Sequence, residues 1–129
     1  MNITKLFILL MSVMFSTHAA AYGSSSSSKK ACNKPKFAHF TPAHLSVVAP
    51  QSEFSFQASA LTNPDSIEVS VKKQPVEITI KEINNAYSIT GKLPADLIDT
   101  YARVDIKAIG TNKCKGSDGW LLKIESVKP

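Results

Sequence analysis

The chain has 129 residues, a formal net charge of +5 and 8% aromatic residues, a size that suits one domain with one modest core. Four lysines lie close together at positions 29, 30, 34 and 36, whereas from Phe37 onward ten basic and ten acidic residues cancel. This distribution excludes the continuous basic groove or helix face of a nucleic-acid-binding protein, so we predict no nucleic-acid partner.

The first 21 residues have the pattern of a secretory signal peptide. Lys5 supplies the positive n-region, Leu6 to Phe15 form the apolar h-region, and residues 19–21 (Ala-Ala-Ala) give a small-x-small cleavage site. The apolar run is too short to span a bilayer stably, and no later segment is long and apolar enough to do so. We therefore expect a soluble exported product, periplasmic or secreted, that begins near Tyr22.

Residues 22–30 form a polar tail ahead of the predicted domain at 31–127. The run from Ser24 to Ser28 has the composition of a flexible spacer, and Lys29 and Lys30 follow it. We expect this basic tail to attract anionic surfaces weakly.

The two cysteines are predicted to form a disulfide, because cysteines in an oxidising compartment usually pair. Cys32 lies just before the first predicted strand and Cys114 in the loop before the last, and the first and last strands of a sandwich often lie side by side. The bridge would close a loop of about 80 residues and contribute about 4 to 5 kcal/mol to the free energy of unfolding. A redox role would require a C-x-x-C pair or a helix N-terminus to lower the thiol pKa, and neither is visible. A free or intermolecular thiol is the alternative.

The rest of the chain alternates apolar and polar residues with a period of two, which is typical of strands with one dry and one wet face. We predict strands over 53–58, 67–72, 75–81, 87–89, 102–108 and 120–124, with a Pro-containing strand before them. Turns are predicted at 63–65, 84–85 and 115–119, and one short helical turn at 94–97. About seven short strands of this kind predict an all-β fold of two packed antiparallel sheets. Trp120 is expected at the centre of the core, with an exposed binding role as the alternative.

Several stretches resemble bacterial immunoglobulin-like domains. FTPAHLSVVAPQSEFSFQAS is similar to the opening of such modules. NPDSIEVSV followed by KQPVEITI is similar to one of their hairpins, and LPADLIDTYARVDIKAIG to the helical turn and strand before the final hairpin. The resemblance covers nearly the whole predicted domain and implies an immunoglobulin-like antiparallel β-sandwich. Tyr101 is out of phase with Val104 and Ile106, so we do not assign it to the tyrosine corner of that fold.

A second resemblance, to CopC-type periplasmic copper-binding proteins, implies a copper-binding function. In that family copper is held by a mature N-terminal histidine and by His and Asp residues on nearby loops. Here His39 and His44 are the candidate metal ligands, and Pro42 between them precludes a helical i, i+4 pair. The expected mature chain has no N-terminal histidine and no histidine beside Asp118. Zinc or copper usually takes three or four ligands, so we expect no bound cofactor and retain copper as the alternative.

The sequence also favours no enzymatic activity. Asp96 and Asp99 flank a predicted turn, where Asp commonly forms local hydrogen bonds, and Asp105 lies on the wet side of a strand. No nucleophile signature and no glycine-rich phosphate loop is visible.

Protein binding is the predicted function, because immunoglobulin-like domains bind through end loops and sheet edges. The predicted binding loop spans Gly110 to Gly119 and carries Lys113, Lys115 and Asp118, with Trp120 next to it. The prediction is an exported non-enzymatic accessory protein that binds another protein, and the alternative is a periplasmic copper-binding protein.

Overall fold

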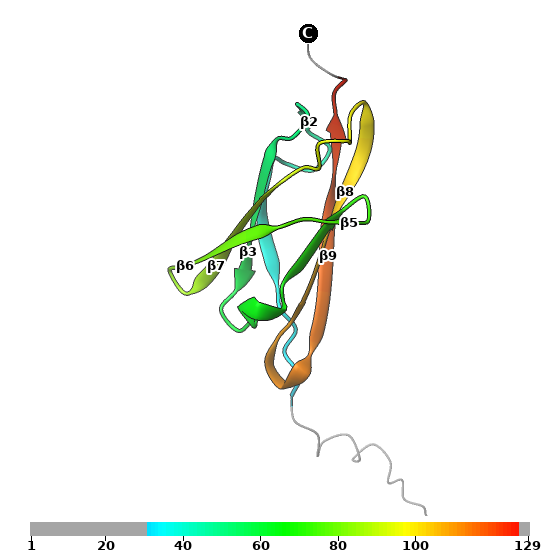
Figure 1. Ribbon diagram of the computed structural model, residues 1–129. Coiled ribbons are helices and arrows are strands. Elements are labelled where there is room, and N and C mark those ends of the chain that lie inside the picture. The colour runs from blue at the N-terminus through cyan, green and yellow to red at the C-terminus, as the bar shows by residue number, and fades with distance from the viewer. Residues whose placement is uncertain (1–30, 127–129) are drawn as a thin grey trace, which may run out of the picture. The chain divides into compact units, whose positions relative to one another are not determined.

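A computed structural model describes residues 31–126, which form two packed β-sheets (Figure 1). The predicted signal peptide (1–21) and tail (22–30) lie outside the described residues. Within the described range the strands are β1 (Phe37–Thr41), β2 (Val47–Val48), β3 (Glu53–Ser59), β4 (Glu68–Val71), β5 (Gln74–Pro75), β6 (Ile78–Ile83), β7 (Ala86–Lys92), β8 (Thr100–Ile109) and β9 (Lys115–Ile124), with 3-10 turns η3 (Pro64–Ser66) and η4 (Thr111–Lys113).

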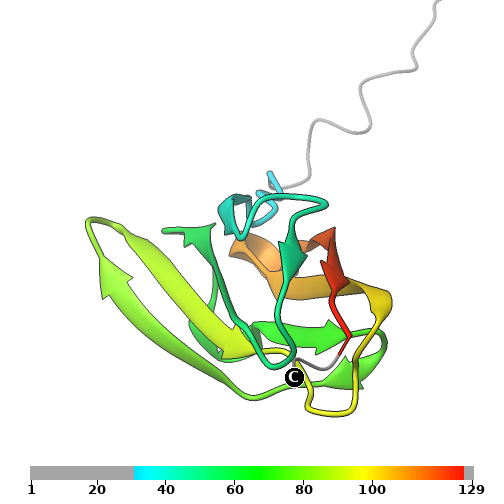
Figure 2. The same ribbon diagram turned by 90° about the horizontal axis from the view of Figure 1, so that it is seen from above.

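The four-stranded sheet has the order β1-β3-β7-β6, and the five-stranded sheet has the order β2-β9-β8-β4-β5. All neighbours are antiparallel except β2 and β9, which pair in parallel. The chain leaves the first sheet after β1 and joins the second at β2. Figure 2 shows the two layers from above. The predicted immunoglobulin-like β-sandwich is therefore confirmed.

The core lies between the sheets because alternate residues of each strand point inward. The most deeply buried side chains are Phe54, Phe56, Val71, Ile89, Val104, Ile106, Leu122 and Ile124. Trp120 is 2% exposed, and its ring centroid lies 4.8 Å from that of Phe40, 6.0 Å from that of Phe54 and 6.1 Å from that of Phe56. The indole Nε1–H donates to the carbonyl oxygen of Pro42 at 2.8 Å, so the ring is buried with its polar atom satisfied. Trp120 is a core residue.

The turn predicted at 115–119 is wrong, because these residues form the first half of β9 and pair in register with β8. The glycines that suggested a turn have packing roles instead. A Cβ at Gly116 would lie 2.9 Å from Pro35 Cδ, and a Cβ at Gly119 would lie 2.5 Å from the carbonyl oxygen of Val104. Glycine is required there for close approach within a strand.

The strand predicted over 75–81 is divided between the two sheets. Gln74 and Pro75 pair with β4 as β5, whereas β6 begins at Ile78 and pairs with β7. Between them the Val76 N–H donates to the Val69 carbonyl oxygen at 3.0 Å, so the chain crosses from one sheet to the other at this point. Residues 31–126 contain nine strands, two more than the predicted seven. The additional strands are β2 and β5, which have two residues each and are too short to show alternation in the sequence. The helical turn predicted at 94–97 is a single turn closed by the Leu97 N–H to the Pro94 carbonyl oxygen at 3.2 Å.

Candidate functional site

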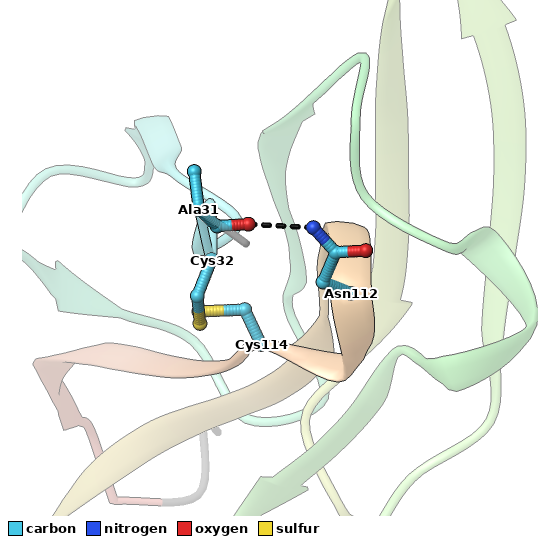
Figure 3. Close-up of a disulfide and its surroundings, with 4 residues drawn as sticks. All are labelled: Ala31, Cys32, Asn112 and Cys114. Carbon is cyan, nitrogen blue, oxygen red and sulfur yellow. Dashed lines mark hydrogen bonds between the residues drawn. A yellow bond between two sulfur atoms is a disulfide. The ribbon is translucent and has the colours of Figure 1, made fainter. Parts of the chain in front are cut away.

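The disulfide between Cys32 and Cys114 is present, with a Cα–Cα distance of 5.2 Å and Cys114 only 3% exposed. It ties the segment before β1 to the turn between β8 and β9. The Asn112 side chain donates to the Ala31 carbonyl oxygen beside it, as Figure 3 shows, and the Thr111 N–H donates to the Asn33 carbonyl oxygen at 3.2 Å. The predicted staple is confirmed, and both cysteines are thereby unavailable as metal ligands.

The residues of the predicted binding loop do not form one surface. Lys113 is exposed in η4, where its φ is 59°, and Lys115 begins β9. Asp118 lies three residues further along the same strand, where it is exposed and lines a surface depression with Arg103 and Ser117. Its carboxylate accepts a hydrogen bond from the Gly119 N–H at 2.7 Å. Trp120 is buried and is not available to a partner.

The two candidate metal ligands, His39 and His44, are both exposed and lie in different structural settings. His39 sits at the β-bulge of β1, where the pairing with β3 shifts between Ala38 and Thr41, and its φ is 56°. The Nδ1 atom of His44 accepts a hydrogen bond from the Leu121 N–H at 3.2 Å. Across residues 31–126, no group of three or more His, Cys, Asp or Glu side chains is arranged to hold a metal ion.

The outer face of the five-stranded sheet carries exposed apolar residues at one end. Strand register places Val47 beside Lys123 and Lys123 beside Tyr101, and the Leu45 N–H donates to the Leu121 carbonyl oxygen at 2.6 Å. Val47 is 62% exposed, Tyr101 55% and Leu45 52%. The Lys123 ammonium lies 5.0 Å from the centroid of the Tyr101 ring. We call Leu45, Val47, Tyr101, Leu121 and Lys123 together the Tyr101 patch.

Sequence reasoning missed this patch, although one signal for it was present. The phase of Tyr101 is opposite to that of the inward residues Val104 and Ile106, which places its ring on the outer face. Val47 could not be assigned in the same way, because β2 is too short to show alternation.

The other end of the same face is basic. Lys34, Lys107 and Lys115 line a shallow depression of about 630 Å³ together with Glu68. Between the two ends Arg103 and Asp105 form an ion pair at 2.7 Å, with both side chains partly exposed. The outer face therefore changes from apolar to cationic along β8 and β9.

The described part of the chain contains no helix long and apolar enough to cross a membrane.

No protein-family model and no curated protein matches the sequence. Solved structures do match the fold. CopC from Methylosinus trichosporium OB3b aligns with a TM-score of 0.56 and 11% identity over 74% of this chain and 97% of CopC. PcoC, a methionine-rich copper resistance protein from Escherichia coli, aligns with a TM-score of 0.51 and 14% identity over 71% of this chain and 99% of PcoC.

The Siglec domain of GspB aligns with a TM-score of 0.55 and 14% identity, over 75% of this chain and 59% of that one. Identities this low establish a shared fold and leave function open. The methionines of the present chain are Met1, Met11 and Met14, all within the predicted signal peptide. The chain thus has an immunoglobulin-like β-sandwich fold with structural likeness to the CopC type.

Proposed function

We propose that this chain is an exported accessory protein that binds another protein and catalyses no reaction. Export is supported by the signal-peptide pattern of residues 1–21 and by the disulfide, which is typical of oxidising compartments. Two of the three carboxylates considered for catalysis have partners on different elements. Asp105 is paired with Arg103, and Asp96 accepts a hydrogen bond from the Gln74 side chain at 3.3 Å.

The observation that carries the proposal is the Tyr101 patch. Strand register places Val47 and Tyr101 on either side of Lys123, and Leu45 joins the same end of the sheet through its backbone hydrogen bond to Leu121. Leu45, Val47 and Tyr101 are each more than half exposed. Exposed apolar side chains grouped at one end of a sheet are typical of protein-interaction sites, and tyrosine is enriched among residues that dominate binding energy. Lys123 within the patch and Arg103, which pairs with Leu121 beside it, would orient an acidic partner surface.

Site-specific photo-crosslinking tests the location of the surface. A photoreactive amino acid in place of Tyr101 is expected to trap a discrete partner in the producing cells. The same amino acid in place of Gln57, which is exposed in β3 of the other sheet, is the matched control and is expected to trap none.

Binding of the purified partner then tests the energetics. Val47→Asp is expected to weaken binding about tenfold, because it places a charge inside an apolar contact. The melting temperature should not change, since the Val47 side chain is 62% exposed. Gln57→Asp is the matched control and should leave the affinity unchanged. If Lys113→Glu weakens binding while Val47→Asp does not, the surface lies instead at the disulfide turn and the Tyr101 patch is not the site.

A further inference from the structure

The sheet edges of this sandwich are protected unequally. An exposed edge strand presents unpaired backbone groups, and proteins block such edges with short strands, bulges, prolines or charges. β2 and β5 have two residues each, and β5 contains Pro75. β1 has a bulge between Ala38 and Thr41. By contrast, β6 has six residues, contains no proline, and pairs with β7 in unbroken register.

The turn that follows β6 shows which backbone groups face outward. Asn84 and Asn85 have φ values of 45° and 60°, typical of a two-residue type I′ hairpin turn. Such a turn closes on a hydrogen-bonded pair, here Ile83 and Ala86, and bonded and non-bonded pairs then alternate along an antiparallel ladder. The N–H and C=O groups of Ile78 and Ile80 consequently point away from β7, toward the free edge.

The sequence along this edge is complementary to itself when read in the antiparallel direction. Residues 77–81 read Glu-Ile-Thr-Ile-Lys, with Thr79 at the centre. A two-fold axis through Thr79 would set Ile78 opposite Ile80 of a second copy, and Glu77 opposite its Lys81. Glu77 and Lys81 are both exposed, and Glu77 lines the same shallow surface depression as Thr79.

We propose that two copies of this chain associate through β6, antiparallel and centred on Thr79, to form one continuous eight-stranded sheet. The outward N–H and C=O groups of Ile78 then exchange hydrogen bonds with those of the second copy's Ile80. By symmetry, Ile80 forms the same hydrogen bonds with the second copy's Ile78. Ile78 and Ile80, already partly buried against the core, extend the apolar layer across the axis. The two Glu77–Lys81 pairs set the register through their charge.

Other self-pairings of this edge are disfavoured. Centring the axis on Lys81 or on Glu82 places like charges directly opposite each other, which destabilises a strand pair. Centring it on Ile80 sets Ile78 opposite Glu82. The sequence of residues 22–30, YGSSSSSKK, lacks apolar alternation and so does not favour that segment as the pairing strand.

The dimer goes beyond the proposed function and uses the other sheet. Pairing through β6 leaves both Tyr101 patches free, so a dimer would offer two copies of the binding surface. Two linked sites bind a clustered partner with greater avidity than one site. Val47→Asp should leave self-association unchanged, so failure of one proposal is distinguishable from failure of the other.

Reversing the charges of Glu77 and Lys81 tests the proposed register of the two β6 strands. In sedimentation experiments over a wide concentration range, the mature secreted protein is expected to show a weak, concentration-dependent dimer, as befits a small interface. Glu77→Lys is expected to raise the dissociation constant at least about tenfold, because symmetry repeats each like-charge contact. The double variant Glu77→Lys/Lys81→Glu should restore the dimer. Glu68→Lys makes the same change at an exposed position on β4 of the other sheet and should have no effect.

Cross-linking gives a second test that does not depend on charge. Residues facing each other in a non-bonded antiparallel pair have Cα atoms about 4.5 Å apart, within the range of about 4.4 to 6.8 Å that a disulfide requires. Thr79→Cys should therefore form an intermolecular disulfide, whereas Thr90→Cys, one strand inward on β7, should not. A wild-type protein that stays monomeric at high concentration, a Glu77→Lys variant that dimerises like wild type, or a double variant that stays monomeric would each overturn the proposal. A β6 edge that captures only a strand of a different protein would overturn it as well.

Discussion

The two sheets of this sandwich differ in how much of their surface is committed to the core. In the five-stranded sheet, β8 and β9 are ten residues long, and Val104, Ile106, Leu122 and Ile124 are 0% exposed. In the four-stranded sheet, β3 buries Phe54, Phe56 and Ala58, but β7 buries only Ile89, and the inward residues of β6 are only partly buried. The β8–β9 hairpin also carries Trp120 and Cys114. The buried core is therefore concentrated in the five-stranded sheet, and β6 is an edge strand whose inward residues are only partly buried.

Removing the disulfide should produce the largest loss of stability. The bridge joins residues 82 apart in sequence, and the chain-entropy model gives about 4.5 kcal/mol for a loop of this length. We expect Cys32→Ala/Cys114→Ala to lower the free energy of unfolding by about that amount in denaturant titrations followed by Trp120 fluorescence. Reduction of the wild-type protein should have the same effect. A loss below about 1 kcal/mol would contradict the chain-entropy model and show that the β8–β9 hairpin stays folded without the disulfide.

Matched Ile→Ala substitutions in the two sheets measure the contrast directly. Ile106→Ala in β8 is expected to cost about 4 kcal/mol, because the side chain is fully buried and its removal leaves a cavity. Ile80→Ala in β6 should cost about 1 to 2 kcal/mol, because that side chain is already partly exposed to water. Equal losses in denaturant titrations would mean that β6 is as much part of the core as β8.

Sequence patterning predicted the long strands well because each has one dry face. Alternation located β3, β4 and β8 to within a few residues. It could not locate β2 or β5, since two residues show no period. Sequence patterning also predicted a turn at residues 115–119, where the structure has a strand. Glycine usually indicates a turn, but it also occurs in strands where a neighbouring residue leaves no room for a side chain. Here those neighbours are Pro35 and Val104, which are distant in sequence from Gly116 and Gly119.

The candidate surface was harder to predict than the fold. The Tyr101 patch joins β2, β9 and β8, and Val47 meets Lys123 only through a parallel pairing across 76 residues of sequence. The disulfide was predictable because compartment and cysteine count determine it almost alone. The basic residues expected in one loop are divided between a turn and a strand, since β9 begins five residues earlier than its alternation indicated.

The smallest expected effect is that of copper, which tests whether the two sheets are joined by a metal. His39 lies in β1 of the four-stranded sheet, and His44 is hydrogen-bonded to β9 of the five-stranded sheet, so a shared ion would tie the sheets together. Two exposed imidazoles with no third ligand grouped beside them in residues 31–126 predict weak binding. We expect a stabilisation of about 0.4 kcal/mol when free copper equals the dissociation constant.

The variant His39→Ala/His44→Ala separates this expectation from a true copper-binding function. If the two imidazoles bind copper only weakly, the variant should lose no more than this small shift in melting temperature, each protein being measured against its own metal-free form. A tight site would behave differently, because copper at a thousand times the dissociation constant stabilises the folded state by about 4 kcal/mol. A stabilisation of that size in wild type, lost in the double variant, would make the histidines the functional site. Stability would then no longer be concentrated in the β8–β9 hairpin, and the contrast between the sheets would hold only for the metal-free protein.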